Sequence, residues 1–353
     1  MSATCEVIGF GSASISLAQV FAEFHVADPK GFETMLASVT AQTVAAPPAA
    51  APQSAIMAAN SVMSCPVFTT GAMLEEGECV WGRGLGIYTE QGGGNGGPGY
   101  IERSAGFQTG GQKALGNGWF VGGSLTYENS AFRSDSGLEK LDADSFVGAL
   151  AVKKQIGPWL FALAGGAGYT WGETSRAMTV GALSATARAD PNSAVVFGRA
   201  RASYELTFAE RFYLRPTVDL DVIGVHQPGY TERGAGALNL VVGDTSQALF
   251  GFTPSLEVGG RVEITPDIPL RVFASGGLTV LSNDDWEQTY RFAGISAMES
   301  FSSTMPINDV VGRISAGIDL QNIENFEVKL QYDGAFADDY QSHGGSLRIG
   351  YRF

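Results

Sequence analysis

The chain has 353 residues, of which 44% are hydrophobic and 16% charged, and its formal net charge is −14. It contains no run of about 18 apolar residues, which excludes a membrane-spanning helix. The negative charge also disfavours nucleic acid as a partner, because the phosphate backbone would repel it.

Residues 1–27 do not have the character of a signal peptide. They lack a basic segment and contain Glu6, so we expect the chain to be the C-terminal part of a longer precursor. Asp28 and Pro29 then form a good helix start, because an N-cap residue is followed by proline at the first helical position.

Two further segments precede the first predicted strand. Residues 45–52 are rich in alanine and proline, and we expect this linker to break the preceding helix. Residues 54–64 read Ser-Ala-Ile-Met-Ala-Ala-Asn-Ser-Val-Met-Ser, and their mainly small side chains suit a slim helix.

From Cys79 onward, apolar and polar residues alternate with the period of two that is typical of β-strands. Each stretch is roughly the 9–11 residues that a tilted strand needs to cross a bilayer. Arg83 and Arg103 interrupt the first two apolar stripes. The twelve predicted strands lie at residues 79–88, 100–110, 119–127, 144–153, 159–171, 196–206, 212–222, 250–262, 270–280, 310–320, 326–332 and 346–353.

The connections between these strands alternate in length. Short ones are predicted at 112–118, 154–158, 207–211, 265–269 and 321–325, and long loops at 128–141, 172–192, 227–245 and 283–305. Short turns at one rim and long loops at the other are typical of an outer-membrane barrel. A soluble β-sandwich also has short strands but does not require this alternation. The predicted fold is therefore all-β, a twelve-stranded antiparallel transmembrane barrel.

The polar stripes of the strands would face the lumen of such a barrel. They carry charges of both signs, which can pair across strands or let a polar chain slide past. The final strand alternates in the same way and ends on two aromatic residues, Tyr351 and Phe353, which we interpret as a C-terminal assembly signal. The predicted lumen charges are Arg199, Arg201, Arg215, Asp219, Arg261, Arg313 and Arg348.

Three stretches resemble the autotransporter β-domain, the translocator of type V secretion. They are Cys79-Val-Trp-Gly-Arg83, residues 230–240 (Tyr-Thr-Glu-Arg-Gly-Ala-Gly-Ala-Leu-Asn-Leu) and residues 332–343 (Tyr-Asp-Gly-Ala-Phe-Ala-Asp-Asp-Tyr-Gln-Ser-His). The resemblance covers about residues 45–353. It implies a barrel in the bacterial outer membrane whose lumen holds a helix leading back to a secreted N-terminal passenger.

The resemblance also implies a division of the chain. Residues 1–44 would be a passenger remnant or junction, residues 45–77 the linker and lumen helix, and residues 78–353 the barrel. On the lumen helix we single out Ser54, Asn60, Ser61 and Ser64. We expect Asn60, Ser61 and Ser64 to hydrogen-bond the arginines at 199, 201, 215 and 313.

The partners implied are outer-membrane lipid and lipopolysaccharide, the barrel-assembly machinery, periplasmic chaperones and the chain's own passenger, with a monomeric barrel. A surface adhesin acting through the loops and a diffusion pore are alternative functions. A pore needs an open lumen, which the helix at 54–64 would block. No cofactor is predicted.

Cys65 and Cys79 flank a short loop between the predicted helix and the first strand. A disulfide closing a loop of about 15 residues would contribute roughly 3 kcal/mol on the chain-entropy model, and the periplasm permits it. Two free thiols are the alternative. Cys5 would be left over.

Catalytic interpretations are weaker. Residues 92–97 contain G-x-G-x-x-G but read better as a hairpin tip, and no G-x-S-x-G motif occurs. The histidines are too scattered for a metal site, although His226 or His343 could meet loop aspartates. Asn60 could be a site of self-cleavage, but a polar helix residue facing lumen water is the simpler interpretation. We predict no enzyme activity.

Overall fold

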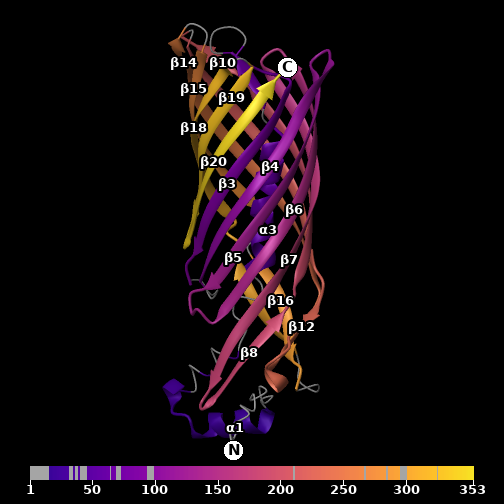
Figure 1. Ribbon diagram of the computed structural model, residues 1–353, viewed down its shortest axis with the longest axis vertical. Helices are drawn as coiled ribbons and strands as arrows, with labels where there is room; N and C mark the ends of the chain where they lie inside the picture. Colours follow the sequence, from indigo (N-terminus) through magenta and orange to yellow (C-terminus); the bar gives the residue numbers. More distant parts are fainter. Residues whose placement is uncertain are drawn as a thin grey trace, which may run out of the picture.

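The computed structural model shows one elongated β-barrel with a helix inside it and an additional small sheet at one end (Figure 1). The chain's C-terminus lies at the opposite end from this sheet. The structure describes residues 16–31, 35, 39, 46–63, 65–68, 73–93, 99–209, 211–265, 268–283, 285–294, 300–323 and 325–353.

Within the described residues, twelve antiparallel strands form the wall, and each predicted strand has its counterpart. The last strand pairs with the first, with Arg348 opposite Arg83, so the sheet closes on itself. The wall consists of β3 (Cys79–Gln91), β4 (Tyr100–Gly116), β5 (Trp119–Ser134), β6 (Glu139–Ile156), β7 (Trp159–Val180), β9 (Asn192–Tyr204), β11 (Phe212–Gln227), β14 (Thr245–Thr265), β15 (Ile268–Leu281), β18 (Val310–Ile323), β19 (Phe326–Ala337) and β20 (Tyr340–Arg352).

The outer face of the wall is a belt of exposed apolar side chains. Leu125, Leu150 and Leu163 are each 63–70% exposed, which water would penalise and lipid tails would not. Aromatic side chains flank the belt, as the girdles of membrane barrels do. They include Trp119, Trp159, Phe208 and Phe212 towards the short turns, and Tyr127, Phe146, Tyr169 and Trp171 towards the other rim.

The two arginines that interrupt the predicted stripes point in opposite directions. Arg83 alternates with exposed Val80 and faces inward, where it lies 4.0 Å from Asp333. Arg103 faces outward, and its guanidinium carbon lies 5.9 Å from the centre of the Tyr88 ring. Neither residue disturbs the strand pairing.

The rim that contains the C-terminus is formed by tight turns, which we call the short-turn rim. The turn after β4 passes through Gly116, Asn117 and Gly118, all with positive φ, and the turn after β6 contains Gly157 at φ 57°. Glycine and asparagine tolerate this left-handed conformation at low cost. β10 (Leu206–Phe208) extends the same rim by pairing with β11.

The opposite rim, which we call the long-hairpin rim, differs from the prediction. The long connections were predicted to be loops, and that is wrong for much of their length. β5 and β6 continue to Ser134 and Glu139, and β7 continues to Val180 and turns back as β8 (Leu183–Ala189). Pairing satisfies the backbone hydrogen bonds that an irregular loop of this length would leave to water.

Two further connections form a four-stranded sheet at this rim, in the order β12-β13-β16-β17. Its strands are β12 (Tyr230–Thr231), β13 (Leu240–Val242), β16 (Asp285–Phe292) and β17 (Phe301–Pro306), with the short helix η1 (Gly236–Leu238) between the first two. Leu240, Val242 and Tyr290 form its small apolar core.

The N-terminal part also lies at the long-hairpin rim (Figure 1). α1 (Leu17–Val26), which the sequence patterns did not predict, begins at Ser16, whose side chain and that of Gln19 form a capping box. Asp28 accepts a hydrogen bond from the Gly31 amide, 2.7 Å, as expected of an N-cap.

α3 (Ala46–Ser61) runs through the barrel (Figure 1). Residues 46–52, predicted to be a linker, are instead the first turns of α3. The junction with the preceding helix, at residues 40–45, lies outside the described residues. Pro47 and Pro48 fall in the first turn, where amide groups have no partner within the helix, so proline is tolerated there. Among the residues that the structure describes, no helix has the length and apolar character needed to cross a membrane.

Candidate functional site in the barrel lumen

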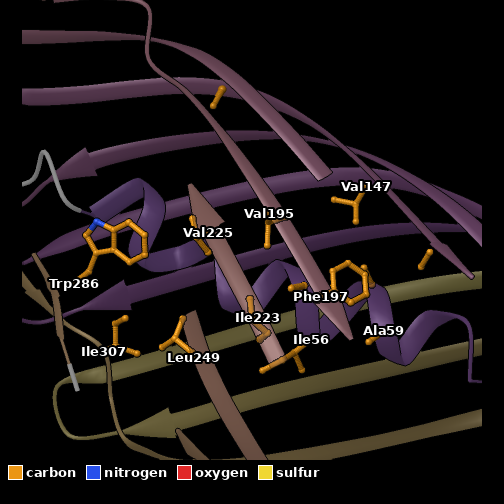
Figure 2. Packing of buried hydrophobic residues seen from close by; sticks show 14 of the residues in the cluster. Ile56, Ala59, Val147, Val195, Phe197, Ile223, Val225, Leu249, Trp286 and Ile307 are labelled. Carbon is orange, nitrogen blue, oxygen red and sulfur yellow. The ribbon is translucent and has the colours of Figure 1, made fainter. Parts of the chain in front are cut away.

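One face of α3 is apolar and packs against the barrel wall. Ala55, Ala58 and Ala59 are at most 3% exposed, and their small side chains let the helix approach the strands closely. Figure 2 shows Ile56 and Ala59 among inward side chains of the wall, including Phe197 of β9. The other members of this cluster include Val62, Val147, Val195, Ile223, Val225, Leu249, Trp286, Met305 and Ile307.

Asn60 anchors the polar face of the helix. Its Oδ1 accepts hydrogen bonds from Arg199 Nη1 at 2.6 Å and from Arg201 Nη2 at 2.8 Å. Each guanidinium is in turn held by a carboxylate of β11: Arg199 pairs with Asp221 and Arg201 with Asp219, through two bonds each. Bidentate pairs of this kind fix the orientation of the two donors independently of the helix.

The other predicted helix contacts are met only in part. Ser61 lies 3.0 Å from Ser124 of β5 and donates to the carbonyl of Ala58, so its partners are neutral. Arg313 reaches the helix, but its partner is Gln53, at 2.9 Å. Ser54 is half-buried beside a lumen cavity, and Ser64 lies outside the described residues.

Arg215 points into the lumen and was expected to hydrogen-bond the helix, but its partners are carboxylates of the wall. It pairs with Glu205, at 2.5 Å between Nη2 and Oε2, and lies 3.9 Å from Glu257. Glu205 directly follows β9, which is next to the strand of Arg215, so its carboxylate lies closer to the arginine than the helix does. Alternation places a side chain inside the barrel but does not select its partner.

The wall opposite the packed face of α3 carries a second charge network. Arg271 donates to Tyr213 at 2.7 Å and pairs with Glu257 at 2.5 Å, and Tyr213 itself donates to Glu257. Arg348 pairs with Glu327 at 3.0 Å. These contacts join strands to one another and do not involve α3.

A cavity of about 290 Å³ lies between this wall and α3, and residues of β9 and β11 also line it. The helix is therefore off-centre in the lumen, against β5, β6, β7, β9 and β11 and away from β14, β15 and β18–β20. Charged side chains that line the cavity include Arg83, Arg201, Glu257, Arg313, Lys329 and Asp333.

A hairpin lies across the short-turn end of the lumen. It consists of β1 (Pro66–Phe68) and β2 (Leu74–Glu76), which pair with each other, and the structure joins Cys65 to Cys79 in a disulfide at its base. Arg261, one of the predicted lumen charges, lies over the Phe68 ring, 5.6 Å from its centre. Sequence patterns did not indicate this hairpin, because each arm has only three residues.

Glu76 of the hairpin forms a buried ion pair. Its Oε2 lies 2.8 Å from Lys153 Nζ, and the lysine side chain is fully buried. Burial alone would raise the pKa of Glu76, but the Lys153 ammonium and a hydrogen bond from Gln112 more than offset it, so the pKa lies below its ordinary value. The carboxylate thus stays ionised at neutral pH.

Another buried ion pair lies at the long-hairpin rim. Arg176 of β7 pairs with Glu232 at 2.6 Å and donates to the backbone carbonyl of Val39 at 2.9 Å. Val20 and Val39 are buried in a cluster with residues of β7, β8 and η1. The Glu232 position lies in one of the motifs that resemble the family, but its partner is 56 residues away and could not be inferred.

The residues considered for catalysis do not gather into a site. His226 bonds to Ser246 and His343 to Tyr332, on strands rather than beside loop aspartates. Across the described part of the chain, no group of three or more His, Cys, Asp or Glu side chains could hold a metal ion. The hairpin tip at 94–98 lies outside the described residues.

A closed barrel with an occupied lumen and unequal rims agrees with the comparison with protein families. The model of the autotransporter beta-domain matches residues 80–333. The chain belongs to this family. It is an outer-membrane translocator barrel of type V secretion, in a family that is not catalytic and whose barrels are associated with a passenger. Among curated proteins, none matches the sequence significantly.

Solved structures support the fold of this autotransporter barrel. The translocator domain of autotransporter NalP from Neisseria meningitidis matches with a TM-score of 0.69 and 16% identity, over 88% of this chain and 99% of that one. The beta domain of the Bordetella autotransporter Brka has a TM-score of 0.55 at 16% identity, over 79% and 99%. The transport unit of AIDA-I from Escherichia coli has 0.55 at 15%, over 87% and 99%.

Proposed function

We propose that this barrel exports the segment that precedes α3, and that α3 is the part of the exported chain that stays in the lumen. The observation that carries the proposal is the path of the chain: α3 spans the barrel, and α1 lies beyond the long-hairpin rim, opposite the C-terminus (Figure 1). With the short turns in the periplasm, the path of α1 and α3 supports our proposal that residues 1–44 are a passenger remnant or junction at the cell surface.

On this proposal residues 45–77 are the linker and lumen helix, and residues 78–353 are the translocator. Asn60 serves as the stop that positions the helix, because two guanidiniums converge on its side-chain oxygen. The contact of Arg176 with the Val39 carbonyl then holds the emerging segment at the surface. A charged wall with its own internal partners lets a polar chain pass without a deep binding minimum.

We further propose that Tyr351 and Phe353 are read by the barrel-assembly machinery and that periplasmic chaperones accompany the unfolded chain. Tyr351, on the outer face of β20, and Phe353, directly after this strand, are 39% and 60% exposed, so a partner can reach them before insertion. After insertion the same face meets lipid, and the barrel works as a monomer beside lipopolysaccharide. A surface adhesin is the second candidate, and the four-stranded sheet at the long-hairpin rim favours it over a diffusion pore.

Epitope accessibility tests the direction of export. An epitope placed before Met1, in a chain supplied with a signal peptide, should be removed when intact cells are treated with protease. A matched epitope at Gly157, in the turn between β6 and β7, should resist until the outer membrane is permeabilised. If the N-terminal epitope is protected in intact cells, the proposed direction of export is wrong.

A further inference from the structure

The helix fills only part of the lumen, so something else must close the remainder. We propose that the hairpin of β1 and β2, rather than α3, is the seal that stops ions and small polar solutes from crossing the barrel, and that the disulfide between Cys65 and Cys79 locks it. This proposal does not depend on the export of a passenger.

Two neighbouring cavities follow the side of α3 that is not packed against the wall. The larger, of about 290 Å³, extends to Pro66 and Glu76 of the hairpin. The smaller, of about 80 Å³, continues towards the long-hairpin rim and shares Gln53 and Arg313 with the first. Charges of both signs line this route, among them Glu102 and Arg313 of the smaller cavity.

The hairpin meets the wall on several sides of the short-turn end. The Glu76 amide donates to Gln155 of β6 at 2.8 Å, and the Leu74 amide donates to Glu205, after β9. Leu74 also packs against Tyr213 of β11. On the other side, Arg352 of β20 donates to the Pro66 carbonyl at 2.6 Å. Together with the contact between Arg261 of β14 and Phe68, these bonds span the mouth of the barrel.

The ion pair of Glu76 and Lys153 is the strongest attachment of the hairpin. The two side chains are 6% and 0% exposed, so each would be left as an unpaired buried charge without the other. Gln112 of β4 donates both to Glu76 at 2.8 Å and to the Gly77 carbonyl at 2.9 Å. One strand on each side of β5 therefore holds the same carboxylate.

The disulfide ties the hairpin at its base. Cys65 and Cys79 are 2% and 0% exposed, and the Gly77 amide donates to the Cys65 carbonyl at 2.9 Å. Since Cys79 is the first residue of β3, the bond attaches the segment after α3 directly to the barrel wall. The hairpin cannot then swing out of the mouth without carrying a wall strand with it.

Conductance in planar lipid bilayers with potassium chloride tests the seal on the full chain. In the first variant, residues 66–76 are replaced by a glycine-serine segment of equal length, with α3 and both cysteines kept. Steady ion current is expected from this variant and little current from the native chain. The matched control, Met57→Ala, removes a side chain of α3 that lines both cavities and should stay at the native level. Current from this helix variant with none from the hairpin variant would overturn the proposal.

Point variants keep the test valid if the replaced hairpin prevents assembly. Glu76→Gln leaves the buried Lys153 ammonium without a counter-charge, so the fraction of time spent open should rise about 100-fold. Adding Lys153→Met removes the unpaired charge and should restore most of the closure. An unchanged open fraction in the single variant would refute the role of the hairpin.

The contribution of the disulfide to closure is tested separately, by the same conductance measurement. The double variant Cys65→Ser and Cys79→Ser should show brief openings that the native chain lacks, because the hairpin keeps its ion pair but loses its tether. Its migration on a gel, heated and unheated, confirms that the barrel has assembled. A record identical to that of the native chain would show that the disulfide does not contribute to closure.

Discussion

The two sides of the lumen are built differently, although the same alternation of residues produces both. The side formed by β5, β6, β7, β9 and β11 presents apolar groups such as Phe197 and Ile223 and packs α3. The opposite side presents charges such as Arg271 and Lys329, and a cavity lies between it and the helix. The comparison indicates that the helix lies against the apolar part of the wall, where Arg199 and Arg201 also anchor Asn60.

Overfilling one side of the lumen with large side chains should give the largest difference between the two sides. Ala58→Trp combined with Ala59→Trp places two large rings where the helix already touches the wall, and we expect assembly to be lost. Heat-modifiable migration on a gel measures the assembled fraction. Ser275→Trp, which points a ring into the cavity, should assemble. Equal loss in both variants would contradict the assignment of the two sides.

Removal of one arginine from each wall should have unequal effects. Arg199→Met leaves Asp221 buried without its bidentate partner, at a cost of about 3–5 kcal/mol of unfolding free energy. Arg348→Met should cost less, because Glu327 retains Arg352 as a second partner. Urea unfolding in detergent micelles measures both, and a larger effect at Arg348 would reverse the expected order.

The helix anchors provide a smaller contrast. Asn60→Ala removes two charge-assisted bonds and should lower the free energy of unfolding by about 1.5–3 kcal/mol, since both guanidiniums keep their carboxylates. Gln53→Ala removes the single bond from Arg313 and should have a smaller effect. The same urea titration measures the pair, and a greater loss for Gln53→Ala would place the main anchor elsewhere on α3.

Acidification should affect the hairpin through Glu76, which faces Lys153 of β6 and Arg215 of β11. Its pKa in the folded state lies below the ordinary 4.5, so its stabilising contribution is present above that value and is lost as pH falls through the folded pKa. The stability difference between the native chain and Glu76→Gln should therefore shrink at strongly acidic pH. A difference that grows on acidification would mean that burial outweighs the ion pair.

Much of the barrel could be predicted because each membrane-crossing strand shows an alternation of apolar and polar residues in its own sequence. The stretch from Leu347 to Phe353 alternates apolar and polar groups, as every membrane-crossing strand here must, with one face to lipid and the other to the lumen. Beyond the membrane this requirement ends. The β7–β8 hairpin and the sheet of β12, β13, β16 and β17 therefore lack a continuous apolar stripe, and their sequences resembled loops.

The sequence by itself determined the strand number, the unequal rims and which arginines point inward, because a period of two assigns each side chain to a face. Only the tertiary structure decided their partners: Arg199 and Arg201 reach Asn60, whereas Arg215 is taken by Glu205. It also decided that Glu76 meets Lys153, 77 positions away. Such pairings depend on how the sheet curves and closes, so they cannot be predicted from the local pattern of residues around either partner.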